Sequence, residues 1–271
     1  MMVNFQGYAW TLTKAKKLTK PLWGDLLPRC LSLILEGMDE QKTIRPLLLR
    51  ARWAKEVSDQ ALDRILDCAT VRAVSCDDFI LRYRDFNHGF FGVLSGRVRL
   101  SIPAVTGDEF ILWDLTEGLW FGSTTLIDKA PVSYDARALV DSKIVEVPRS
   151  AVVAVAQEFP EIYEFLFADQ ALYSRMMYKL MIRMLFYPLR PRLAFRLLVL
   201  IDIYGRKNGP SAILEEGLSQ GDFAKLVNGS RQQVNRIFRQ WDEEGIVKLV
   251  DGQYRIPSVK RLAIEAKSTD P

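Results

Sequence analysis

One segment near the C-terminus carries a row of side chains that can read DNA bases. They are polar and recur on one face of a helix: Arg231, Gln232, Asn235 and Arg236. Arginine can donate to both O6 and N7 of guanine, and glutamine or asparagine can pair with N6 and N7 of adenine. The first turns of such a helix are the part that reaches base edges in the major groove. The pattern therefore predicts a base-reading helix.

The residues around this row predict a helix-turn-helix. Ser230 is a good N-cap, and Gln233 three residues later completes a capping box. Asn228-Gly229 comes just before, and both residue types tolerate the left-handed backbone that a sharp turn needs. An earlier helix begins at Leu218 or Ser219. The buried face of the second helix consists of apolar residues at helical spacing: Val234, Ile237, Phe238 and Trp241.

Residues 245–256 predict a β-hairpin, because Asp251-Gly252 is a strong signal for a two-residue turn. A hairpin in this place is typical of a winged helix-turn-helix; a helical hairpin with a solvated basic face is the alternative. Polar residues near the helix ends are expected to contact phosphates: Ser219, Gln220, Ser230 and Arg239. Such contacts orient a domain on DNA without reading its sequence.

The rest of the chain predicts a barrel followed by a long helix. Between residues 71 and 147, short apolar runs alternate with Gly, Pro and Asp, which is typical of a small antiparallel barrel. Residues 159–187 show a heptad pattern whose seam has five members: Leu166, Tyr173, Met177, Leu180 and Met184. We expect this seam to pair with a second copy of the chain; packing on the chain's own barrel is the alternative.

The expected fold class is α+β, with four parts along the chain. Residues 1–52 form an N-terminal extension of unknown role, and residues 53–158 form the barrel. Residues 159–187 form the dimerisation helix, which ends before Pro188 and Pro191. Residues 188–271 form the winged helix-turn-helix domain, in which residues 206–217 are expected to be a polar loop.

Composition limits the function classes. The net charge is only +4, so the case for DNA rests on a local surface and not on bulk charge. Three scattered cysteines and one histidine, His88, predict neither a disulfide framework nor a metal site. A cupin-like metal enzyme usually needs at least two histidines. We therefore expect no metal, no cofactor and no enzyme activity. No apolar stretch approaches the roughly 20 residues that span a membrane, and a cytoplasmic protein is expected.

Over roughly residues 53–262 the sequence resembles the catabolite-activator and fumarate/nitrate-regulator (Crp-Fnr) family. The matching motifs lie in both domains: Ser219-Gln220, Ser230-Arg231, Val234, Arg236, Glu244-Gly245-Ile246, residues 92–100, Leu115, Gly118 and Phe121-Gly122. The resemblance implies a jelly-roll barrel like that of cyclic-nucleotide-binding domains, a homodimer, and a two-fold-symmetric site on double-stranded DNA. It also implies control by a signal at the barrel and contact with RNA polymerase.

The barrel departs from this family at the ligand pocket. In the cyclic-nucleotide binders, a Gly-Glu pair and an Arg-Ser pair hold the ribose and the phosphate. Here Gly122 is followed by Ser123, and Val132 precedes Ser133. A buried phosphate without that arginine loses its charge-assisted, bidentate partner. The departures predict a degenerate pocket without useful affinity for cyclic AMP.

A function from another class also fits these elements. A signalling adaptor could use the barrel and the long helix while its C-terminal unit binds protein. A DNA-binding assay against random sequence distinguishes the adaptor from the regulator.

Overall fold

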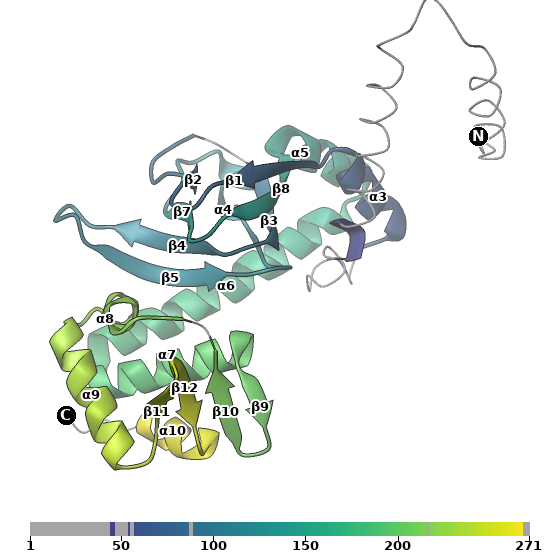
Figure 1. Cartoon of the computed structure of the whole chain (residues 1–271). Coiled ribbons are helices and arrows are strands. Elements are labelled where there is room, and N and C mark those ends of the chain that lie inside the picture. Colours follow the sequence, from purple (N-terminus) through teal and green to yellow (C-terminus); the bar gives the residue numbers. More distant parts are fainter. Residues whose placement is uncertain (1–43, 47–53, 55–56, 87–88, 216, 268–271) are drawn as a thin grey trace, which may run out of the picture. The chain divides into compact units, whose positions relative to one another are not determined.

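The computed structural model of the chain describes residues 44–46, 54, 57–86, 89–215 and 217–267 (Figure 1). The chain divides into two compact units, Met1–Pro46 and Leu47–Pro271, and the fold below is that of the second. Most of the predicted N-terminal extension lies outside the described residues, as does His88. Sheets, a long helix and a C-terminal helix-turn-helix are all present, so the predicted α+β class is confirmed.

The described barrel consists of two four-stranded sheets with antiparallel pairing, ordered β1-β8-β3-β6 and β2-β7-β4-β5. The strands are β1 (Thr70–Val74), β2 (Phe79–Leu81), β3 (Gly89–Ser95), β4 (Val98–Pro103), β5 (Glu109–Leu115), β6 (Trp120–Phe121), β7 (Asp135–Ala138) and β8 (Ser142–Pro148). Phe91, Val98 and Ile144 are fully buried between them. Gly122 has a φ of +96°, and a Cβ there would lie 2.3 Å from the carbonyl oxygen of Gly89, so this corner requires glycine.

Helices α3 (Asp59–Asp67), α4 (Thr124–Asp128) and α5 (Arg149–Glu158) flank the barrel. Ser58 caps α3 by accepting a hydrogen bond from the backbone N–H of Ala61 at 3.3 Å, as its sequence position predicts. The apolar face of α3, which includes Leu62 and Ile65, is buried, and α3 contacts α5. Helix α3 precedes the first strand, α4 lies between β6 and β7, and α5 leads into the long helix that follows.

Helix α6 (Glu161–Phe186) turns the two leucines of the predicted dimer seam toward the chain itself. Leu166 and Leu180 are 2% and 5% exposed, and Met177 packs against the barrel core. Tyr173 and Met184 are half-buried. Leu166 and Leu180 are therefore covered by the chain itself, whereas Tyr173 and Met184 stay partly exposed. Other apolar residues of α6 are exposed and form what we call the outer stripe: Phe167, Tyr178, Met181, Ile182, Leu185 and Phe186.

The C-terminal domain begins with α7 (Leu189–Tyr204) and ends with α10 (Val259–Glu265). Between them lie β9 (Arg206–Asn208), β10 (Ser211–Leu214), α8 (Gln220–Val227), α9 (Arg231–Glu243), β11 (Lys248–Val250) and β12 (Gln253–Ile256), with the strands ordered β11-β12-β10-β9. The segment expected as a polar loop, residues 206–217, therefore contains strands β9 and β10. Leu193, Phe223 and Trp241 are fully buried in the shared core.

In the part of the chain that the structure describes, no helix combines the length and the apolar character needed to cross a membrane.

Candidate nucleic-acid interface

The turn between α8 and α9 is held by local contacts that the sequence predicts. The Ser230 hydroxyl accepts from the backbone N–H of Gln233 at 3.2 Å, and the Gln233 side chain accepts from the Ser230 N–H at 3.0 Å. Asn228 has a left-handed backbone with a φ of 50°. A Cβ on Gly229 would lie 2.6 Å from Leu189 Cδ1, so α7 approaches the turn closely. The reciprocal cap and the tight turn fix where α9 begins.

The inner face of α9 is locked into the domain core. Val234 and Trp241 are fully buried, and the Phe238 ring meets the Phe223 ring of α8 edge-on with centroids 5.2 Å apart. Aromatic pairs in this geometry stabilise beyond their buried area. Because the inner face cannot rotate away from this core, the opposite face of α9 is fixed in its orientation.

The opposite face carries the predicted base-reading residues. Arg231, Gln232 and Arg236 are exposed, whereas Asn235 is half-buried. The Asn235 amide donates to Gln220 Oε1 at 2.5 Å, a contact between α9 and α8. Asn235, which is predicted to read a base, is thus hydrogen-bonded to Gln220, which is predicted to contact a phosphate. The bond orients both side-chain amides.

Charge is unevenly distributed along α9. Its first turns carry exposed Arg231 and Arg236, and Arg239 follows, while exposed acidic residues end the helix: Asp242, Glu243 and Glu244. The helix N-terminus also carries the positive end of the backbone dipole. Negative phosphates are therefore attracted to the start of α9 and repelled from its end, which suits a helix whose first turns enter the groove.

Two predicted phosphate contacts have their hydroxyls engaged in helix caps. The Ser219 hydroxyl accepts from the backbone N–H of Asp222 at 3.1 Å and donates to Asp222 Oδ2 at 2.7 Å. Ser230 caps α9 as described above. Both remain exposed at helix N-termini, where a backbone N–H can also meet an anion.

Sequence reasoning missed a pair of basic residues on the wing. Lys248 of β11 lies opposite Arg255 of β12 in the strand register, and both side chains are exposed. Two cations facing each other across a hairpin repel one another, and an approaching polyanion relieves that repulsion. The signal was the placement of Lys248 three positions before, and Arg255 three positions after, the Asp251-Gly252 turn.

Two side chains of the chain itself lie buried at the predicted ligand pocket of the barrel. Val132 is 1% exposed and belongs to the barrel core, as does Tyr134. The Tyr134 hydroxyl accepts a hydrogen bond from the Gly122 N–H at 3.0 Å, and burial raises the pKa of this phenol. Ser133 points to the exposed side.

The Ser123 hydroxyl forms hydrogen bonds with helix α6. The hydroxyl donates to Asp169 Oδ2 at 3.1 Å and accepts from Gln170 Nε2 at 2.8 Å. Burial raises the pKa of Asp169, although the bond from Ser123 opposes that shift. The position at which the family's ligand binders carry glutamate therefore links α6 to the barrel.

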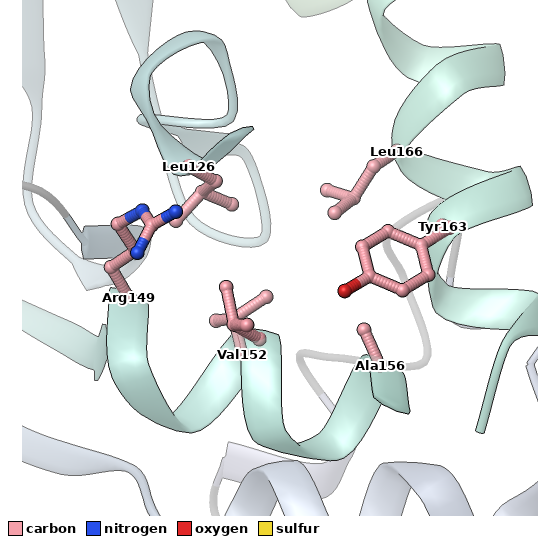
Figure 2. A pocket seen from close by; sticks show the side chains of 7 residues that line it. Leu126, Arg149, Val152, Ala156, Tyr163 and Leu166 are labelled. Atoms are coloured by element: carbon pink, nitrogen blue, oxygen red, sulfur yellow. The ribbon is translucent and has the colours of Figure 1, made fainter. Parts of the chain in front are cut away.

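A separate hollow lies between α4, α5 and α6 (Figure 2). Its walls are mainly apolar, with Leu126, Val152 and Leu166 among them, and Arg149 and Tyr163 supply polar groups. Its volume of about 100 Å³ is far below the roughly 300–1,000 Å³ of ordinary ligand sites. It is therefore too small to replace the nucleotide pocket.

Comparison with known proteins matches both domains. Residues 71–159 match the family model of the cyclic nucleotide-binding domain, and residues 191–264 match that of the Crp-like helix-turn-helix domain. The chain is similar to the CRP-like cAMP-activated global transcriptional regulator of Mycobacterium tuberculosis, with 26% identity over 175 residues, 65% of this chain and 78% of that protein. It is also similar to the cyclic AMP receptor protein of Thermus thermophilus, with 27% identity over 172 residues, 64% and 76% of the two chains.

Among solved structures, FixK2 from Bradyrhizobium japonicum shares the fold, with a TM-score of 0.66 and 20% identity. The similarity covers 74% of this chain and 99% of FixK2.

The Tyr134 hydroxyl provides a test of the filled pocket. Replacing Tyr134 with Phe removes the acceptor of the buried Gly122 N–H, and an unpaired buried donor costs about 1–3 kcal/mol. Urea unfolding should show the free energy of unfolding falling by that amount. Tyr83→Phe, at a side chain 38% exposed, is the control and should change it by less than about 0.5 kcal/mol. Equal effects of the two changes would show that Tyr134 does not fill the pocket as described.

Proposed function

We propose that this chain, which belongs to the Crp-Fnr family of DNA-binding transcription regulators, acts as a homodimer on a two-fold-symmetric DNA site. The observation that carries the proposal is the geometry of α9. Its apolar face is locked in the core, and its polar face presents Arg231, Gln232 and Arg236 to solvent.

In this proposal, α9 enters the major groove by its first turns. Arg231, Gln232, Asn235 and Arg236 read bases, and Asn235 is held in place by Gln220. Phosphates are contacted at the N-termini of α8 and α9, by Ser219, Gln220 and Ser230, and by Arg239. Lys248 and Arg255 on the wing supply further cationic contacts to the backbone.

The dimer forms through the outer stripe of α6 and not through the predicted seam. Phe167, Tyr178 and Leu185 are 68%, 62% and 65% exposed, which is unusual for large apolar residues on one helix face. Positions 167, 171, 174, 178, 181 and 185 follow the alternating four- and three-residue steps of a coiled-coil contact. A second copy supplies the same surface, as a two-fold dimer requires.

Three further features of the proposal follow from family membership. RNA polymerase is the expected protein partner, and the cytoplasm is the expected location. The protein has no enzymatic activity of its own. The signal that acts through the barrel is something other than cyclic AMP, because Val132 and Ser123 stand where the family's ligand binders carry arginine and glutamate.

Selection of bound DNA from a random pool with the purified full chain tests the proposal as a whole. We expect enrichment of an inverted repeat with two similar half-sites. Enrichment of no sequence would contradict the proposal and favour the signalling adaptor, whose C-terminal unit would bind protein.

Arg236 provides the test of base reading. Arg236→Ala should weaken binding to the selected site by about 1–3 kcal/mol and relax preference at one base pair in each half-site. Arg206→Ala is the matched control, since Arg206 is an exposed arginine of the same domain on β9. Binding to the site and to its single-base variants is measured by fluorescence anisotropy. Preserved sequence preference in Arg236→Ala would show that α9 docks differently.

Leu185 provides the test of the dimer surface. Leu185→Asp places a charge in the proposed apolar contact, and a charge buried without a partner is strongly unfavourable. Light scattering should then report a mass of 31.0 kDa, against twice that value for the parent chain. Val105→Asp, at a fully exposed apolar residue away from α6, should stay dimeric. A dimeric Leu185→Asp would reject the outer stripe as the interface.

Titration with cyclic AMP tests whether the barrel binds this nucleotide. Calorimetric titration of the parent chain should show no micromolar binding, because the phosphate would lack its arginine partner. Micromolar affinity would overturn this account of the barrel and point to Arg137 as a replacement ligand.

A further inference from the structure

A buried ion cluster connects the barrel to the first helix of the helix-turn-helix. Arg99 on β4 donates from Nε to Asp114 Oδ1 at 2.7 Å and from Nη2 to Asp114 Oδ2 at 2.8 Å. Its remaining nitrogen, Nη1, donates to Asp222 Oδ1 of α8 at 2.5 Å. The side chains of Arg99 and Asp114 are 7% and 3% exposed, and that of Asp222 is 21% exposed. One guanidinium thus binds two carboxylates from different domains.

Asp222 performs two tasks at once. Its Oδ2 accepts from the Ser219 N–H at 2.9 Å and closes the capping box of α8, while its Oδ1 accepts from Arg99. Burial alone would raise the pKa of Asp222, but the bonds from Ser219 and Arg99 outweigh burial and lower it. The carboxylate therefore stays charged at neutral pH. Because Asp222 belongs to the capping box of α8, its bond to Arg99 connects the barrel to the N-terminus of that helix.

Two other contacts hold the rest of α8 against the barrel. Arg196 of α7 donates to the carbonyl oxygens of Ile111 and Leu112 on β5 and to that of Leu226 on α8. Lys225 Nζ lies 2.9 Å from Glu109 Oε1 of β5. We call these contacts, together with the Arg99–Asp222 bridge, the junction. Because α8 and α9 share a core, an α8 held by the barrel also holds α9.

We propose that Arg99 is a positioning residue for DNA binding. Through Asp222 it fixes the orientation of α8 and α9 on the barrel, and so fixes the distance between the two recognition helices of a dimer. This proposal rests on the proposed function. A dimer binds its DNA site more tightly than one half-site only when both recognition helices bind at the same time. A fixed distance between the two helices lowers the entropy that is lost when the second helix binds.

Asp222→Asn separates this role from a general effect on folding. Arg99 keeps both of its bonds to Asp114, so no buried charge in the barrel loses its partner. The asparagine oxygen can still accept from the Ser219 N–H and maintain the cap. Asp222→Glu keeps the carboxylate and gives the usual capping-box residue, so it should restore the parent behaviour. Glu158→Gln, which breaks the exposed pair with Arg64, is the matched control.

The DNA experiment compares three duplexes by fluorescence anisotropy: the selected site, the same site with its half-sites moved apart by two base pairs, and a single half-site. Asp222→Asn should weaken binding to the selected site about tenfold, leave half-site binding nearly unchanged, and reduce the preference for the selected spacing. Asp222→Glu and Glu158→Gln should behave as the parent chain. An equal loss on full and half-sites would show a merely structural carboxylate and overturn the proposal. Unchanged or tighter binding would also overturn it.

Hydrogen exchange tests the junction without DNA. In Asp222→Asn, amides of β5 and α8 should exchange faster, while those of β3 and β8 keep the parent rates. Unchanged exchange at β5 and α8 would overturn the proposal even if a DNA site exists. Failure to select any DNA site would overturn the proposed function while the exchange result still decides whether the bridge holds the junction.

Discussion

The buried guanidinium of Arg196 is, beside the Arg99–Asp222 bridge, the contact on which the arrangement of the barrel and the DNA-binding domain depends. Its side chain comes from α7 and is 1% exposed, and its hydrogen bonds go to main-chain carbonyl oxygens of β5 and α8. Burial lowers its pKa to about 10, so it remains charged at neutral pH. The Phe110 and Trp113 rings lie 5.6 and 5.3 Å from the guanidinium carbon and stabilise the cation. A buried charge has a strong preference for the one geometry that supplies these partners, and this geometry sets how the two domains meet.

The rest of the molecule follows from this junction and from the seating of α6. Once α6 places Leu166 and Leu180 inward, the outer stripe becomes its only large apolar surface in the described part of the chain. Once α8 is held at its cap, the shared core fixes α9 with its arginines outward. The filled pocket adds a further link, because Ser123 binds Asp169 and Gln170 of α6 in the place where the family's ligand binders hold a nucleotide. In this transcription regulator the barrel and α6 are therefore already joined without that ligand.

The sequence predicted the features that depend on neighbouring residues. The capping box of Ser230 and Gln233, the Asn228-Gly229 turn and the wing at Asp251-Gly252 are all local, and all three are present. The dimer surface of α6 could not be chosen from the sequence, because the helix has two adjacent apolar stripes and periodicity does not tell which one faces the barrel. The Arg99–Asp222 bridge joins residues 123 positions apart, so no local sequence pattern predicts it. Strands β9 and β10 were missed because both are short, β9 is polar throughout, and β10 pairs with the distant strand β12.

In the proposed dimer, two copies of the chain present α9 from fixed positions to one symmetric site. Hydroxyl-radical footprinting of the parent protein on its selected DNA measures this arrangement. We expect two equivalent protected regions related by two-fold symmetry, with their centres about one helical turn, roughly 10 base pairs, apart or a small multiple of it. A single protected region, or two regions whose separation varies among bound molecules, would contradict it.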